Sequence, residues 1–239
     1  MSSFTDYERE LQPARQRFAS ESLLTKVMTP DVEPALLEAF FIQFCALGVG
    51  MTEPVEGWIR RAGERCEAMG ATELGRALVK HAKHEAGHHE MMIADTRKLV
   101  ERWNARRTPR LDADQLLARI PPPGVRRYQD LHEEVIAGDA PYGQVAIEYE
   151  IEALSERHGA PLLAHCAAIL GKETLEGLSF LEEHVAIDVG HTKFNARQLD
   201  GFLKQRPDAL PALVAAGSAA LDAYAAFLGD CLAEARSVE

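Results

Sequence analysis

Apolar residues recur at helical spacing along almost the whole chain. No run of alternating β-branched residues bounded by turn signals stands out, so the pattern predicts an all-α protein. Proline and glycine mark the expected helix boundaries. We expect about seven main helices. Helical spacing covers these ranges: 6–28, 31 to about 50, 52–70, 71–107, 125–137, 142–170, a stretch that begins after 171 and reaches about 205, and 209–235.

The chain length and the course of the pattern predict a single domain over residues 1–239. At 239 residues the chain is long enough to bury a substantial core. The least structured stretch, 108–124, contains three consecutive prolines and reads as a linker within the domain. The last helix, rich in Ala and Leu, is a plausible surface for core packing or for a homodimer.

Composition excludes several classes of function. The formal net charge of −11 argues against a nonspecific nucleic-acid binder and against a basic membrane-surface protein. The four cysteines are scattered without a CxxC pair, so neither a zinc knuckle nor a disulfide framework is expected. The N-terminus lacks a signal peptide, and no stretch reaches the roughly 20 uncharged apolar residues of a membrane span. We expect a cytoplasmic protein with no membrane partner.

The segment EHVAIDVGH, residues 183–191, carries the sharpest candidate chemistry. His184, Asp188 and His191 fall within an arc of roughly 60° on a helix, so two imidazoles and a carboxylate share one face and could share one ion. Apolar residues crowd the same segment, which predicts a central helix. Ionisable groups on a central helix need partners or a metal.

A second segment, HAKHEAGHHE, holds the partner ligands at residues 81–90. Glu85 and His88 form an ExxH pair one helical turn apart. His89 lies on the opposite flank of Glu85 and could replace His88. His81, one further turn back, could be a third donor or a supporting group outside the metal shell.

The helix expected over residues 142–170 supplies a carboxylate. Glu148 and Glu152 are four residues apart and share a face, and one of them should bridge two ions. Glu150 points to the opposite side. We therefore expect Glu150 to face solvent and to pair with Arg157 or another surface cation.

The mixture of imidazoles and carboxylates favours iron. Carboxylates stabilise the higher oxidation states and bridge metals, while imidazoles are good neutral ligands for ferrous iron. A structural zinc site would be expected to recruit cysteine, and no cysteine lies in either segment.

The ligand pattern resembles the heme-oxygenase-like di-iron oxidases and oxygenases, which share a helical fold with heme oxygenase, thiaminase II and the pyrroloquinoline quinone synthase. In that family HxxxDxxH lies on the third core helix, as His184, Asp188 and His191 do here, and the alkene-forming fatty acid decarboxylases have ExxH on the first. The phrase YEIEALS resembles the family's Tyr-x-x-Glu pattern, which selects Glu152 as the bridging ligand and leaves Glu148 as its neighbour. Where some members have a glutamate seven residues before the histidine, this chain has His81.

The resemblance implies a heme-oxygenase-like bundle whose metal-bearing core spans about residues 71–205. It implies two Fe²⁺ ions per chain, one of them weakly held, and O₂ as co-substrate, with an external electron donor as a further partner. The substrate would be a small metabolite derived from an amino acid, an amine or a fatty acid, oxidised in a biosynthetic pathway. The alternative is a metal-independent enzyme of cofactor biosynthesis or a non-catalytic binding protein with the same fold.

Clues to the substrate come from the residues that precede His184. Leu181 and Phe180 continue the metal face as an apolar wall, and Gly177 either leaves a gap there or allows close helix packing. An amino-acid carboxylate would need a cation, and those available on the metal-bearing helices are Lys83, Arg157, Lys193 and Arg197.

Overall fold

The computed structural model describes residues 3–21 and 24–238, and this part of the chain is helical and contains no strand. Three short 3₁₀ turns, at Pro141–Gly143, Lys172–Gly177 and Pro207–Ala209, connect the later helices. The α-helices are α1 (Phe4–Glu21), α2 (Leu24–Val27), α3 (Pro34–Thr52), α4 (Val55–Ala68), α5 (Thr72–Ala82), α6 (His88–Asn104), α7 (Ala113–Leu117), α8 (Pro123–Ala137), α9 (Gln144–Leu170), α10 (Ser179–Gln205) and α11 (Leu210–Arg236).

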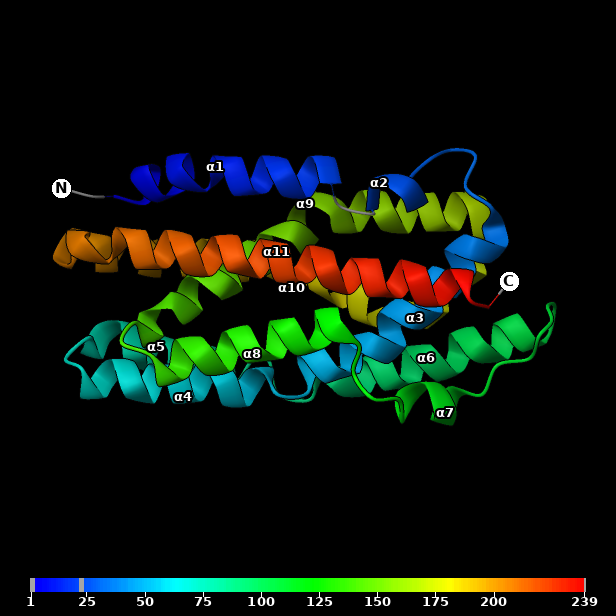
Figure 1. Ribbon diagram of the computed structural model, residues 1–239, viewed down its shortest axis with the longest axis horizontal. Coiled ribbons are helices and arrows are strands. Elements are labelled where there is room, and N and C mark those ends of the chain that lie inside the picture. The colour runs from blue at the N-terminus through cyan, green and yellow to red at the C-terminus, as the bar shows by residue number, and fades with distance from the viewer. Residues whose placement is uncertain (1–2, 22–23, 239) are drawn as a thin grey trace.

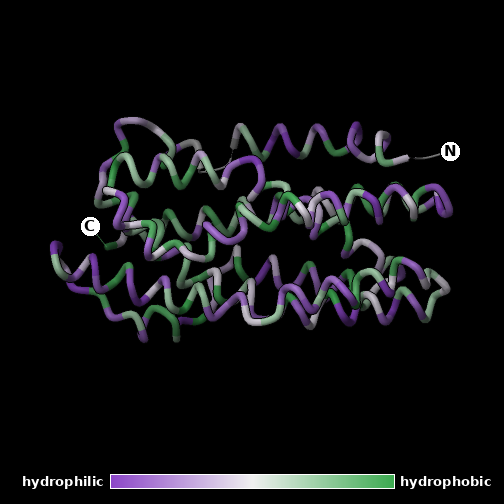
Figure 2. Tube along the Cα trace, turned by 180° about the vertical axis from the view of Figure 1, so that it is seen from behind, coloured by the Kyte–Doolittle hydropathy of each residue, from purple (hydrophilic) through white to green (hydrophobic). Residues whose placement is uncertain are grey.

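The long helices run side by side in an elongated bundle (Figure 1). Helix α11 crosses the middle of the bundle and packs against α1, α3, α8 and α9. Helices α9 and α10 pack along each other, as do α3 and α6 and the pair α4 and α5. Purple and green segments alternate along the tube in Figure 2, as expected of helices that each bury one face. The all-α prediction is confirmed.

The helix expected over residues 71–107 is two helices, and this expectation was wrong. Helix α5 ends at Ala82 and α6 begins at His88. Gly87 sits between them with φ of +86°, in the left-handed region that a residue without a Cβ adopts at little cost. The break falls inside the histidine-rich segment, so Glu85 is not on a helix and the ExxH spacing does not describe one helical face.

The other boundaries lie close to those expected, although the chain has more helical segments than about seven. The expected helix over 6–28 corresponds to α1 and α2, and residues 22–23 between them lie outside the described residues. Within the expected linker, a short helix, α7, begins where the side chain of Asp112 accepts hydrogen bonds from the next turn.

Two helical stretches, 34–68 and 207–236, are long and apolar enough to cross a membrane by length and composition alone. Of their most apolar windows, 72% and 44% respectively is buried inside the bundle. Core helices of an all-α protein pass the same test. The four cysteines are buried and free, as expected of reduced core residues.

Glu150 is buried, which corrects the expectation that it faces solvent. Its side chain is 1% exposed and accepts two hydrogen bonds from Arg15, at 2.8 and 2.7 Å. The hydroxyl of Tyr7 donates a third at 3.1 Å. Helix α1 covers this side of α9 and supplies both donors, so the ion pair ties the first helix to the helix that carries Glu152. Arg15 also pairs with the partly exposed Glu8.

We expect truncation of the two partners of Arg15 to have unequal costs. Glu150→Ala leaves a buried guanidinium short of its main partner and should lower the free energy of unfolding by about 3–5 kcal/mol. Glu8→Ala removes the same atoms from a side chain that is 31% exposed and should cost about 1 kcal/mol or less. Urea unfolding of both variants measures the difference, and equal costs would contradict the structural role given to Glu150.

Candidate metal centre

Helix α10 carries three of the predicted ligands, and its start is fixed by α6. Ser179 Oγ donates to Asp95 Oδ1 at 2.7 Å and the backbone N–H of Phe180 donates to Asp95 Oδ2 at 2.9 Å. Asp95 is buried on α6, so its carboxylate satisfies groups at the N-terminus of another helix. This contact holds in register the two helices that carry His88 and His184.

Helix α9 approaches α10 closely because Gly159 has no side chain. A Cβ at that position would lie 2.3 Å from Cγ2 of Val185, nearer than packed atoms can come. The close approach sets Glu152 of α9 opposite the face of α10 that carries His191. Val185 thus serves helix packing. The expectation of a central helix was wrong, because the side of α10 away from the ligands faces solvent and Val189 is 39% exposed.

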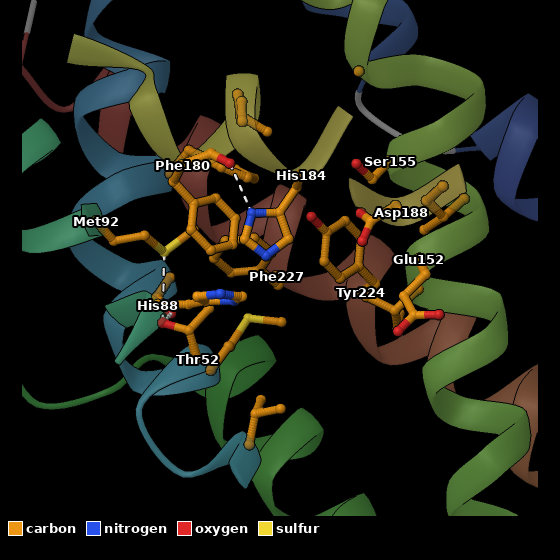
Figure 3. Close-up of a pocket in the computed structure, with 18 of the residues that line it drawn as sticks. Thr52, His88, Met92, Glu152, Ser155, Phe180, His184, Asp188, Tyr224 and Phe227 are labelled. Atoms are coloured by element: carbon orange, nitrogen blue, oxygen red, sulfur yellow. Dashed lines mark hydrogen bonds between the residues drawn. The ribbon is translucent and has the colours of Figure 1, made fainter. Parts of the chain in front are cut away.

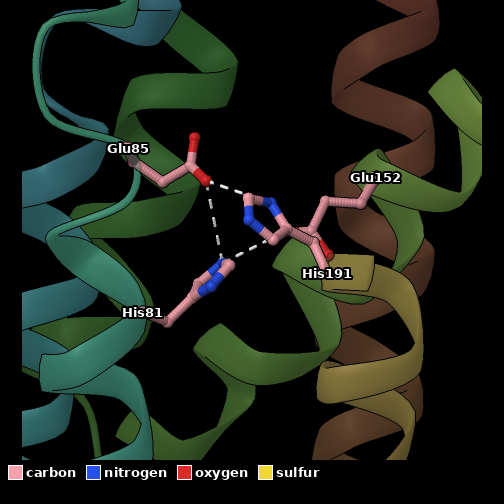
Figure 4. Close-up of side chains that lie close together, drawn as sticks. All are labelled: His81, Glu85, Glu152 and His191. Carbon is pink, nitrogen blue, oxygen red and sulfur yellow. Dashed lines mark ion pairs between the residues drawn. The ribbon is translucent and has the colours of Figure 1, made fainter. Parts of the chain in front are cut away.

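One group of potential ligands comprises His81, Glu85, Glu152 and His191 (Figure 4). His81 Nε2 lies 3.0 Å from Glu152 Oε1, and His191 Nδ1 lies 3.4 Å from Glu85 Oε1 and 3.7 Å from Glu152 Oε1. One donor atom from each residue lies within 4.8 Å of all the others. Three regions that are distant in sequence therefore meet at one point: the end of α5 with the turn that follows it, α9 and α10.

A second group comprises Glu85, His88 and His184. His88 Nδ1 lies 3.1 Å from Glu85 Oε2, so this carboxylate and imidazole meet even though the helix is broken between them. His184 Nδ1 donates to the carbonyl of Phe180 at 2.7 Å, which leaves the lone pair of Nε2 free to bind a metal. The rings of His88 and His184 lie edge to face with centroids 4.8 Å apart.

Glu85 belongs to both groups and is placed to bridge them. The expected bridge was Glu152, but that side chain joins only the first group as the structure stands. Glu85 owes its position to the turn between α5 and α6, which sets it between the two pairs of histidines. A residue in a turn can reach both groups, whereas Glu152 is held on one side by its helix.

Unpartnered buried atoms test whether these residues fit a metal. His81 Nε2, Glu152 Oε1, Asp188 Oδ1 and His191 Nδ1 are buried and have no hydrogen-bond partner among the described residues. Such atoms cost free energy unless something binds them. They are nitrogen and oxygen atoms with lone pairs, and His81 and Glu152 approach to 3.0 Å without hydrogen-bond geometry. A bound cation could satisfy those of His81, Glu152 and His191 together, because these three residues belong to one ligand group.

The expectation that His184, Asp188 and His191 share one ion differs from the arrangement observed. His184 falls in the second group and His191 in the first, because seven residues along a helix span about 10 Å while each ligand atom must lie about 2 Å from its ion. Asp188 lies between them, with Oδ1 3.6 Å from His191 Nδ1.

The structure separates the residues that the sequence left open. His81 and His88 each lie in a group, whereas His89 lies in neither. Glu148 is also outside both groups among the described residues; it accepts a hydrogen bond of 2.5 Å from Gln144, and burial raises its pKa to about 8. Burial thus favours the protonated form of Glu148 in the metal-free protein, as it does for Glu152.

Burial and neighbouring charges shift the pKa values of the grouped residues in different directions. The hydrogen bond with Glu85 raises the pKa of His88, and the hydrogen bond with Asp188 raises that of His191. Burial opposes ionisation of Glu85, but the hydrogen bond with His88 and the neighbouring imidazoles outweigh it and lower the pKa. Burial lowers the pKa of His184, so the ring is neutral at pH 7. Burial and the nearby Asp188 raise the pKa of Glu152 well above the usual range, so its anionic form needs a compensating cation.

Asn195 is a supporting residue that the sequence reading missed. It is fully buried on α10, one turn after His191, and its Nδ2 donates to Glu152 Oε2 at 2.7 Å. The bond leaves Glu152 Oε1 to face His81 and His191. The spacing of the sequence could have indicated this residue, because Asn195 follows His184, Asp188 and His191 on the same face of the helix, one turn further on.

A cavity of about 130 Å³ adjoins the second group (Figure 3). Glu85, His88, His184 and Asp188 lie at its wall, and most of the remaining lining is apolar. Phe180 and Leu181 line it, as the sequence predicted. Gly177 instead packs against α6, where a Cβ would lie 2.8 Å from Cγ of Leu99, so close packing is the reason for this glycine.

Comparison with known proteins identifies the fold. No family model matches the chain, and no curated protein matches it in sequence. A crystal structure from Shewanella denitrificans, described as a domain of unknown function with a heme oxygenase-like fold, superposes with a TM-score of 0.76. The match covers 99% of this chain and 94% of the other, at 19% identity. The chain has a heme oxygenase-like fold. In this fold the two ligand groups lie where α9 and α10 meet the turn between α5 and α6.

The structure predicts that His88 and His89 differ in metal binding. A chain with two ligand groups should bind two divalent ions. His88→Ala removes a donor from the second group and should reduce binding to about one ion per chain. His89→Ala, the neighbouring control, should leave two. Anaerobic titration with Fe²⁺ or Co²⁺, followed by metal analysis, measures both, and equal losses would contradict the assignment.

Asn195→Ala should weaken metal binding at the first ligand group without removing a ligand. Supporting hydrogen bonds to ligating carboxylates are typically worth 10- to 100-fold in metal affinity, and we expect a loss of about that size for one of the two ions. Lys193→Ala is the control on the same helix, because Lys193 is exposed and lies in neither ligand group. A similar loss in both variants would show that the effect of Asn195 is not specific.

Proposed function

We propose that this protein is a non-haem di-iron enzyme that uses O₂ to oxidise a small metabolite. The observation that carries the proposal is the pair of ligand groups that share Glu85. In the first group, His81, Glu152 and His191 each have a buried donor atom without a hydrogen-bond partner among the described residues. A cavity beside the second group offers room for a substrate. The reaction classes we consider are N-oxygenation, desaturation, and oxidative cleavage or decarboxylation.

The donor set supports iron as the metal. The second group, Glu85 with His88 and His184, is the combination of two imidazoles and one carboxylate that non-haem iron oxygenases use. The first group adds a second carboxylate to two imidazoles. The free cysteines lie in neither group, which disfavours a thiolate-rich structural zinc site.

In this proposal the residues of the chain have three roles: they hold the ions, line the cavity and deliver a proton. His81, Glu152 and His191 would hold one ion, His88 and His184 the other, and Glu85 would join them. When bound, two such ions would supply the redox chemistry that O₂ activation needs. The apolar cavity wall would exclude water and keep the substrate beside His184 and Asp188. Glu148, whose pKa burial raises to about 8, lines the same cavity and could deliver a proton there.

Oxygen consumption by the iron-loaded protein tests the proposal. Loaded anaerobically with Fe²⁺, the protein should consume O₂ at a rate tied to oxidation of its iron. Glu85→Ala removes the residue common to both groups and should slow this consumption at least about 100-fold, as loss of a group central to the site does. Glu90→Ala, an exposed acid in the first turn of α6, is the matched control and should retain the wild-type rate.

Two results would contradict the proposal. Fewer than about one iron per chain, with or without substrate-like compounds, would favour the metal-independent heme-oxygenase-like enzyme or binding protein. Unchanged O₂ consumption in Glu85→Ala would place the reactive iron elsewhere. Circular dichroism of each variant separates loss of the site from loss of the fold.

A further inference from the structure

Two methionines line the cavity beside the second ligand group. Met51 lies near the end of α3 and is 4% exposed, and Met92 lies on α6 and is 2% exposed. His88 precedes Met92 by one helical turn, so the two side chains lie on the same face of α6. Both thioethers therefore share the cavity wall with potential metal ligands.

The sulfur of Met92 packs closely against α3. Thr52 Oγ1 lies 3.7 Å from Met92 Sδ, and Figure 3 shows this contact at the cavity wall. Gly48 leaves the space that the sulfur fills, because a Cβ at that position would lie 2.5 Å from Sδ. The thioether is thus fixed beside the cavity and shielded from bulk solvent.

A thioether accepts an oxygen atom more readily than the other side chains of this wall that bind no metal. Its sulfur lone pair forms the S–O bond without the loss of a hydrogen, and the product is methionine sulfoxide. No cysteine of the described residues lines the cavity, and much of the remaining lining is aliphatic or aromatic carbon. When no substrate is bound, the two sulfur atoms are the oxygen acceptors that the wall offers.

We propose that the thioethers of Met51 and Met92 are oxidised to sulfoxides at the metal centre when the cavity holds no substrate. One oxygen atom of O₂ forms the S–O bond, and the other leaves as water after uptake of two protons. Sulfur supplies two electrons, and two Fe²⁺ ions supply the other two as they become Fe³⁺. The inference rests on the proposed function, because the centre must activate O₂.

The modification also affects substrate binding. A sulfoxide is polar and larger than a thioether, so its oxygen occupies part of the cavity and interrupts the apolar wall. The oxidised protein therefore binds an apolar substrate more weakly. Because sulfoxides can be reduced back to thioethers, the effect is reversible.

Isotope labelling locates the oxygen acceptor. The protein is loaded anaerobically with Fe²⁺ and exposed to ¹⁸O₂ without substrate, and its peptides are analysed by mass spectrometry. Heavy oxygen should appear at one or both cavity thioethers, and fragment ions distinguish Met92 from its neighbour Met91. We expect at least about tenfold more oxidation at the cavity pair than at Met69 or Met91. Equal or greater oxidation at Met69 or Met91 would overturn the proposal.

Hydrogen peroxide added to the metal-free protein should give the opposite order. Met69 is 47% exposed and Met91 is partly buried, so peroxide from solvent reaches them before it reaches Met51 and Met92. If peroxide oxidises the cavity pair as fast as Met69, solvent access explains their oxidation and the inference fails.

Two controls connect the oxidation to the metal centre. Zn²⁺-loaded protein under ¹⁸O₂ should remain unmodified, because zinc has no redox chemistry. Glu85→Ala removes the residue common to both ligand groups and should abolish oxidation of the cavity pair, whereas Glu90→Ala, at an exposed acid of α6, should retain it. Wild-type oxidation in Glu85→Ala would refute a role of the metal centre, and circular dichroism checks that each variant is folded.

The outcomes separate this inference from the proposed function. Iron-dependent O₂ consumption without heavy oxygen at Met51 or Met92 would contradict the inference and leave the oxygenase proposal standing. Absence of O₂ consumption by the iron-loaded protein would contradict both.

Discussion

Buried donor atoms without partners are the constraint around which the structure is arranged. Imidazole nitrogens and carboxylate oxygens from α5, α9, α10 and the turn after α5 face one another in the middle of an apolar bundle. For four of these atoms, His81 Nε2, Glu152 Oε1, Asp188 Oδ1 and His191 Nδ1, burial costs free energy, since each has lost water and gained no hydrogen bond. The surrounding contacts hold them in place: Asp95 at the start of α10, Gly159 between α9 and α10, and Asn195 on Glu152. A metal ion bound by these atoms would offset that cost.

Periodicity and chain breakers were sufficient to predict the fold class and most helix boundaries. They failed at the turn between α5 and α6, because HAKHEAGHHE has few strong helix breakers and its one glycine could be tolerated within a helix. What decides the break is the conformation of Gly87, which no hydrophobic pattern records. Glu150 was misplaced for a related reason. A helical wheel shows on which side of α9 Glu150 lies. It does not show that α1 covers that side.

The candidate site was only partly accessible from spacing. HxxxDxxH correctly drew attention to α10. A helical-wheel projection shows which residues share a face but not how far apart they lie along the helix axis. His184 and His191 were therefore expected to share an ion, although they are two turns apart. Glu85 was singled out as a ligand, but its position between the two groups depends on the turn. Asn195 binds no metal in this arrangement and matters only through Glu152, so ligand motifs gave no reason to select it.

The break at Gly87 also affects how the chain is connected. His81 ends one rigid helix and His88 begins the next, with Glu85 on the short connection between them. Metal ions bound to the two groups would cross-link α5, α6, α9 and α10 at positions far apart in sequence. Cross-links of this kind close long loops and remove conformations from the unfolded chain. The ions would then be reversible cross-links. The metal-free protein would unfold with less cooperativity between α5 and α6 on one side and α9 and α10 on the other than the metal-loaded protein.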